Sequence, residues 1–105
     1  MKTYSINVTQ LAQEDLQEAK LFYDAQDLNL GNYFIDSILV DLESLGFYGG
    51  IHSKIHGYYK MLAKRFPFAI YYDIEDDSVI VHAILHTRKN PTSIKARLYN
   101  LITPQ

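Results

Sequence analysis

Residues 58–86, with the sequence YYKMLAKRFPFAIYYDIEDDSVIVHAILH, decide the fold of this chain of 105 residues. They contain three runs rich in aromatic and β-branched residues, at positions 58–63, 66–74 and 79–86. Apolar side chains alternate along these runs, which is the period of a strand with one buried face. The acidic stretch 75–78 forms the turn between the last two runs. The segment therefore predicts an antiparallel meander of three strands.

A strand and two helices are predicted upstream of the meander. Residues 3–8 alternate as a short strand, and Thr9 can cap a helix that runs to about residue 27. A second helix is predicted from about residue 32 to 46, followed by a glycine-rich loop to about residue 57. Because the link between the helices is short, they should pack as an antiparallel hairpin.

A short helix is predicted at the C-terminal end. Asn90 and Pro91 resemble a helix cap followed by proline at the first helical position. Apolar residues then keep helical spacing, at Ile94, Leu98, Leu101 and Ile102. The element order becomes βααβββ(α), an α+β domain whose N-terminal helical hairpin packs on an antiparallel sheet, with the helices on one side. A single domain, residues 1–105, accounts for this length.

Composition narrows the class of protein. Apolar and aromatic residues make up 48% of the chain and charged residues 21%, which is typical of a globular domain. The chain has no cysteine, which excludes disulfides and thiolate chemistry and fits a reducing cytoplasm. Residues 1–8 contain no continuous apolar run, so no signal peptide is expected. No segment approaches the roughly 20 apolar residues of a membrane span. We expect a cytoplasmic protein without membrane contact.

The charge is distributed unevenly. Residues 1–50 contain two basic and eight acidic residues, a net charge of −6, whereas residues 51–105 contain eight basic and four acidic residues, a net charge of +4. The four acids of the second half all fall within residues 73–77. This pattern indicates one face built for an anionic partner. Two ordinary solvated faces are the alternative, and the charges alone leave both open.

The predicted hairpin suggests where the cations gather. Centring its turn on Asp76 places Arg88 opposite Lys64, to within one or two positions. The same register places His86 opposite Phe66. Because side chains alternate along a strand, Lys64, His86 and Arg88 would then project from the same face of the sheet.

A cluster of this kind indicates an anionic ligand, since like charges facing one another across strands cost a few tenths to about 1 kcal/mol. Lys60 lies further along the neighbouring strand, and Arg65 points the other way unless Pro67 twists the strand. The alternative is that Lys64 and Arg88 protect a sheet edge against aggregation.

If the anion is RNA, each residue has a chemical role. Cleavage by the neighbouring 2′-hydroxyl needs a proton acceptor, a proton donor for the leaving 5′-oxygen, and cations on the phosphate. His86 can serve as base or acid. Arg65 and Arg88 can hold phosphate oxygens in two-pronged fashion, while Lys60 and Lys64 supply point charges.

Other kinds of site are not indicated. His82 and His86 are four residues apart, which on a strand is about 13 Å and too far to share a metal. His52 and His56 lie in a loop without a nearby acidic or cysteine ligand. No serine has the context of a nucleophile elbow, and no glycine-rich stretch is long enough to cradle phosphate. No metal or cofactor is therefore expected.

Five motifs, in order along the chain, carry a resemblance to a known family. Three belong to the sheet: GYYKML at 57–62, KRFPFAIYY at 64–72 and AILHTRKNP at 83–91. Two belong to the helical hairpin: DLQEA followed by Phe22-Tyr23, and Leu30-Gly31 followed by Phe34. Over residues 3–98 the chain resembles the RelE/ParE superfamily, the toxins of type II toxin–antitoxin systems, some of which are described as plasmid stabilisation proteins.

The resemblance implies a toxin kept inert by a co-expressed antitoxin, as a homodimer or a toxin–antitoxin hetero-oligomer. RelE-like members cut mRNA at the ribosome with basic residues on the strands, which makes a metal-independent endoribonuclease the enzymatic interpretation. The implied catalytic residues are His86, Arg65 and Arg88, and the implied phosphate-binding residues are Lys60, Lys64 and Lys89.

Three functions stay open at this point. ParE-like members instead bind DNA gyrase and have no hydrolytic site, and a third kind of chain would bind its antitoxin without being toxic. The net charge of −2 departs from the basic character of ribosome-dependent nucleases, and polyanion affinity grows with the number of phosphates neutralised. We favour mRNA cleavage slightly, because the cluster of Lys64, His86 and Arg88 has no obvious packing purpose.

Overall fold

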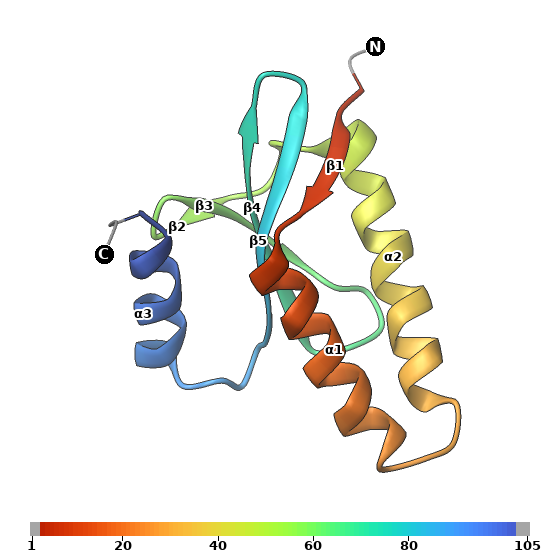
Figure 1. The fold of residues 1–105 in the computed structure, drawn as a ribbon. Helices are drawn as coiled ribbons and strands as arrows, with labels where there is room; N and C mark the ends of the chain where they lie inside the picture. Colours follow the sequence, from red (N-terminus) through yellow and green to blue (C-terminus); the bar gives the residue numbers. More distant parts are fainter. Residues whose placement is uncertain (1–2, 103–105) are drawn as a thin grey trace.

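The computed structural model describes residues 3–102, with side chains described for residues 3–100. The ends of the predicted domain, and the side chains of Leu101 and Ile102, lie outside that description. Figure 1 shows the elements in their chain order, which is β1 (Ser5–Val8), α1 (Gln10–Asp24), α2 (Leu30–Tyr48), β2 (Lys54–Ile55), β3 (Tyr58–Leu62), β4 (Phe68–Glu75), β5 (Ser78–His86) and α3 (Pro91–Ile102).

The strands form one five-stranded sheet in the order β1-β5-β4-β3-β2. The predicted antiparallel meander is confirmed, because β3 pairs with β4 and β4 with β5 in antiparallel fashion. β1 pairs with β5 in parallel, so the sheet is mixed rather than wholly antiparallel. β2 is a two-residue strand in the segment that was predicted to be loop. The sequence order and the α+β class match the prediction apart from this extra edge strand.

The register of the β4–β5 hairpin differs from the prediction by two residues. A two-residue turn aligns Glu75 with Ser78, one position from the predicted alignment, and its first residue, Asp76, has a φ of 53°. β5 then contains one extra residue, His82, because its neighbours Val81 and Ala83 pair with consecutive residues of β4. Such a bulge shifts every later pair by one more position.

The predicted pairing of Arg88 with Lys64 is therefore wrong. His86 lies opposite Phe68 rather than Phe66. Lys64 falls in the connection between β3 and β4, and Arg88 falls in the turn after β5, so neither belongs to a strand face. The three residues are brought to one end of the sheet by the connections rather than by a shared strand register.

The helical hairpin is built from local signals in the sequence. The side chain of Thr9 accepts a hydrogen bond from the backbone N–H of Ala12 at 3.2 Å, which confirms the predicted N-cap. At the other end of α1, Asp24 accepts hydrogen bonds from Lys20 and from the backbone N–H of Gly31. A Cβ at Gly31 would lie 2.2 Å from the Asp24 carboxylate, so glycine is required for this close approach of α2.

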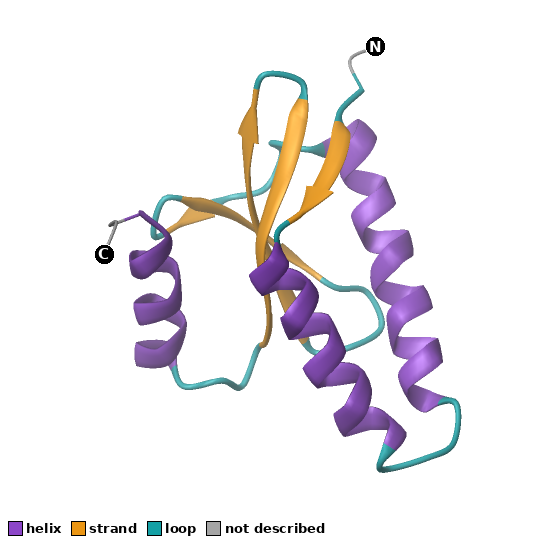
Figure 2. Ribbon diagram, in the orientation of Figure 1, coloured by secondary structure: helices purple, strands orange, loops and turns teal. Residues whose placement is uncertain are grey.

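The helices cover both faces of the sheet, which corrects the prediction that they lie on one side (Figure 2). α1 and α2 pack on one face, where Phe34, Ile38 and Leu45 contact the core with Ile70 and other buried strand residues. On the other face, α3 inserts Leu98, which is fully buried, against a second cluster of strand residues. Three tyrosines are buried in the core: Tyr23, Tyr71 and Tyr72.

Candidate functional site

An open pocket lies where the edge of β5 is no longer covered by β1. β1 pairs with β5 only as far as Val81, after which the chain turns into α1 and crosses beside the rest of β5 (Figure 1). The pocket has a volume of about 380 Å³. We call it the edge pocket; its lining residues are Asp15, Glu18, Ala19, Phe22, Phe68, Ile84, Leu85, His86, Arg88 and Lys89. It contains three of the six predicted site residues.

The uncovered edge of β5 is held by side chains. Asp15 of α1 accepts a hydrogen bond from the backbone N–H of Ile84 at 3.0 Å. Arg97 of α3 donates two hydrogen bonds to the same carboxylate, both at 2.9 Å, and a third to the carbonyl of His82 at 3.1 Å. The ion pair therefore connects α1, β5 and α3 and fixes one wall of the edge pocket.

Asp15 and Arg97 were not predicted as an organising pair. Asp15 lies three residues after Ala12 and four before Ala19, both of which are buried, so it is an acid on the inward stripe of α1. An acid at such a position needs a buried partner. That signal could have identified Asp15, but nothing in the sequence points to an arginine 82 residues away.

His86 sits at the end of β5 in a half-buried position. Its ring meets Phe68 edge-on, with the ring centroids 5.2 Å apart. Its Nδ1 accepts a hydrogen bond from the backbone N–H of Arg88 at 3.0 Å. A neutral imidazole has one donor and one acceptor nitrogen, so this contact assigns the proton to Nε2. Nε2 is the atom left to meet a ligand.

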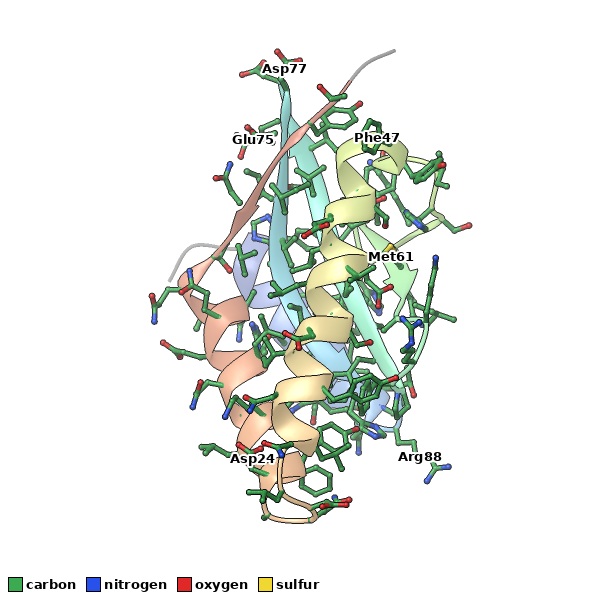
Figure 3. The ribbon with its side chains drawn as sticks, turned by 90° about the vertical axis from the view of Figure 1, so that its right-hand side faces the viewer. Asp24, Phe47, Met61, Glu75, Asp77 and Arg88 are labelled. Atoms are coloured by element: carbon green, nitrogen blue, oxygen red, sulfur yellow. The ribbon has the colours of Figure 1, made fainter. Side chains whose placement is uncertain are left out.

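Arg88 and Lys89 lie in the turn that follows β5, and both are exposed. Two backbone hydrogen bonds shape the turn: Thr87 donates to Pro67 at 2.8 Å, and Lys89 donates to His86 at 3.0 Å. Within residues 3–102, neither Arg88 nor Lys89 forms an ion pair. Figure 3 shows Arg88 at the opposite end of the sheet from Glu75 and Asp77, so the acidic hairpin turn does not neutralise it.

Lys64 and Arg65 lie in the connection between β3 and β4, and both are exposed. The backbone N–H of Lys64 donates to the buried carboxylate of Asp41 on α2 at 3.2 Å, which anchors this connection. Because Pro67 accepts the hydrogen bond from Thr87, the connection lies beside the turn that holds Arg88. Four of the predicted cations are thus carried by two adjacent turns at one end of the sheet.

Lys60 is not brought to this group. It lies on β3 opposite Tyr71, and directly paired residues project from the same face of a sheet. Tyr71 packs in the cluster on the α3 face, whereas Phe68 and its partner His86 belong to the face covered by α1 and α2. Lys60 therefore lies on the opposite face of the sheet from His86.

Two of the other histidines, His82 and His52, have structural surroundings. His82 approaches Asp73 with 3.1 Å between Nε2 and Oδ1 and contacts the ring of Tyr58. His52 contacts the hydroxyl of Tyr72, and burial lowers the pKa of His52. In the part of the chain that is described, no group of three or more His, Cys, Asp or Glu residues could hold a metal ion. No helix in that part is long and apolar enough to span a bilayer.

Comparison with known proteins identifies the fold. No family model and no curated protein matches the sequence. Among solved structures, a chain from the chromosomal ParDE TA system of P. aeruginosa superposes with a TM-score of 0.71 at 17% sequence identity, covering 80% of this chain and 96% of that one.

The chain has the fold of that ParDE chain.

This result confirms the fold that the five sequence motifs predicted. At 17% identity the likeness concerns the course of the backbone and does not extend to the site residues. In this chain the β3–β4 connection and the turn after β5 lie at one end of the sheet and carry four cations.

Proposed function

We propose that this chain is the toxin of a type II toxin–antitoxin module and that it inhibits translation by cleaving mRNA. The observation that carries the proposal is the group of exposed cations at one end of the sheet, Lys64, Arg65, Arg88 and Lys89, beside His86 in an open pocket. The RelE/ParE-type fold supports the toxin role. A cognate antitoxin and a cytoplasmic location belong to the same proposal.

The proposed chemistry uses side chains of this chain. As the 2′-oxygen attacks the neighbouring phosphorus, the 2′-hydroxyl gives its proton to water. The bond to the 5′-oxygen breaks, the 5′-oxygen takes a proton from His86, and a 2′,3′-cyclic phosphate and a free 5′-hydroxyl result. Arg65 and Arg88 stabilise the negative charge that develops on the non-bridging oxygens, and Lys64 and Lys89 position the neighbouring phosphates.

The contact with Arg88 determines which nitrogen of His86 can meet the substrate. With Nδ1 occupied by the Arg88 N–H, the neutral ring donates a hydrogen bond from Nε2 to a phosphate oxygen. To act as the acid for the leaving 5′-oxygen, His86 must carry protons on both nitrogens, which breaks the contact with Arg88. We therefore expect binding of substrate to shift Arg88 away from Nδ1.

The test is cleavage of ribosome-bound message by the purified chain. Arg65→Ala and His86→Ala should each lower the cleavage rate by about a hundredfold or more, the usual effect of removing a stabilising cation or a proton-transfer group. Lys95→Ala is the matched control, because Lys95 is an exposed cation on α3 away from the edge pocket. Full activity in both site variants would refute the proposal.

A gyrase-directed toxin is the second candidate, supported by the likeness to a chain of a ParDE system. In that case expression of the chain would cause DNA breaks while messages stay intact. Substitutions on the outer surface of α3, such as replacement of the half-exposed Tyr99 with alanine, would then relieve toxicity. A chain that binds an antitoxin without being toxic would leave growth unchanged when expressed alone.

A further inference from the structure

The edge pocket has walls of opposite charge. On α1, Glu18 and Phe22 are four residues apart and lie on the same helix face. Asp15 belongs to the same stripe, but its carboxylate already accepts three hydrogen bonds. The Glu18 side chain is exposed and forms no ion pair or hydrogen bond within residues 3–102, so it is the acid available to a ligand. The facing wall has Arg88 and Lys89, which form no ion pair with any residue that the structure describes.

The floor and rim of the pocket are apolar. Phe68 and Ile84 form buried parts of the lining, and the small side chain of Ala19 leaves space above them. Phe22 stands at the rim with 57% of its surface exposed. An exposed aromatic ring beside unpaired cations is the combination with which proteins bind single-stranded nucleic acid, by stacking bases and holding phosphates.

We propose that the edge pocket is a base-binding subsite for a guanine nucleotide. The base stacks on Phe22, the Glu18 carboxylate accepts hydrogen bonds from guanine N1–H and the 2-amino group, and the phosphate contacts Arg88 and Lys89. This inference rests on the RNA substrate of the proposed function and adds a base preference to it.

The choice of guanine follows from hydrogen-bonding chemistry. A carboxylate only accepts hydrogen bonds, through two adjacent oxygens. Guanine alone among the four bases presents two adjacent donors on its Watson–Crick edge. Adenine and cytosine present one amino donor next to a ring-nitrogen acceptor, which a carboxylate repels. The volume of about 380 Å³ is near the lower end of the usual range for small-molecule sites, which suits one nucleotide.

A segment of a partner protein is the competing occupant, since the floor of the pocket is apolar. The charge pattern favours the nucleotide, because a nucleotide carries hydrogen-bond donors at one end and a phosphate at the other. These ends match Glu18 on α1 and the cations after β5.

The test is an NMR titration of the full chain with 5′-GMP, 5′-IMP, 5′-AMP and inorganic phosphate. GMP should bind about tenfold more tightly than AMP, and IMP, which lacks the 2-amino group, should lie between them. The shifted amides should fall in residues 15–22 and 84–89. Glu18→Gln should abolish the preference for GMP, whereas Glu14→Gln, an exposed acid one turn earlier that does not line the pocket, should retain it. Phe22→Ala should weaken the binding of all three nucleotides, whereas Leu21→Ala should leave their binding unchanged.

Several results would overturn the inference. These are equal binding of GMP and AMP, an unchanged preference in Glu18→Gln, the same shifts with phosphate alone, or occupation of the pocket by a partner's segment with no response to nucleotides. The proposed function fails separately. If the chain cuts no RNA but binds GMP through Glu18, the nuclease is refuted and the subsite stands. If it cuts RNA with the same sites in Glu18→Gln, the subsite is refuted and the nuclease stands.

Discussion

The ion pair between Asp15 and Arg97 should be the most costly polar contact to break in this fold. Asp15→Ala removes the acceptor of three hydrogen bonds, leaving the N–H of Ile84 unsatisfied and Arg97 with only its bond to the His82 carbonyl. Removing one partner of a buried pair costs about 3–5 kcal/mol. Since 11% of the Asp15 and 22% of the Arg97 side chain is exposed, we expect about 2–3 kcal/mol.

A double-mutant cycle measures this energy. Because the chain has no tryptophan, urea unfolding of the wild type, Asp15→Ala, Arg97→Ala and the double variant is best followed by circular dichroism. The coupling energy should be about 2 kcal/mol, and the melting temperature of Asp15→Ala should fall by roughly 10–20 °C. Lys20→Ala, which breaks the more exposed pair with Asp24, should have a much smaller effect. A coupling energy as small as that of the surface pair would show that the Asp15–Arg97 ion pair does not stabilise the fold.

Three further predictions follow from local contacts. Gly31→Ala should destabilise the fold by about 1–3 kcal/mol, because the new Cβ would overlap the Asp24 carboxylate. Gly46→Ala should instead stabilise α2 by up to about 1 kcal/mol, because the atom nearest to its new Cβ is 3.5 Å away. The midpoints of urea unfolding of the two variants test both predictions. The hydrogen bond from Lys20 lowers the pKa of Asp24 below its ordinary value of 3.8. The ionised Asp24 carboxylate therefore contributes its full stabilisation above pH 3.8, and this stabilisation is lost as the pH falls through the lower pKa of the folded state. In Asp24→Asn, the unfolding free energy should no longer show this loss at acidic pH. Burial lowers the pKa of His52, so the unfolding free energy should decline as the pH falls below about 6.5, and a His52→Gln variant with the same decline would contradict this.

Elements with a local signal were predictable from the sequence. The alternation in 58–86 indicated the meander, and Thr9 as an N-cap indicated the start of the first helix. Pairings between distant segments were not predictable in the same way. The parallel docking of β1 against β5 joins residues about 70 positions apart, and the two-residue β2 is too short to show a period. Ile94 and Leu98 showed that the last helix has an apolar face without showing which side of the sheet it covers.

The candidate site was predicted only in part, for a definite physical reason. A strand register has a period of two, so one unrecognised bulge at His82 changes which residues face one another. The cations nevertheless gather at one end of the sheet, because the connection that precedes β4 meets the turn that follows β5 there. The hydrogen bond from Thr87 to Pro67 shows this contact. Lys60 departs from the group because alternation puts it on the other face.

If the cations at this sheet end bind RNA phosphates, as we propose, the affinity for RNA should fall as the salt concentration rises, and it should fall less steeply when these cations are removed. The affinity for a short single-stranded RNA should be measured over a range of salt concentrations for the wild type, the double variant Arg88→Ala/Lys89→Ala, and Lys95→Ala. Removing one cation that neutralises a phosphate should reduce the slope of log affinity against log salt by about 0.7. We therefore predict a slope smaller by about 1.4 in the double variant and an unchanged slope in Lys95→Ala. An unchanged slope in the double variant, or an equal reduction in Lys95→Ala, would contradict the claim.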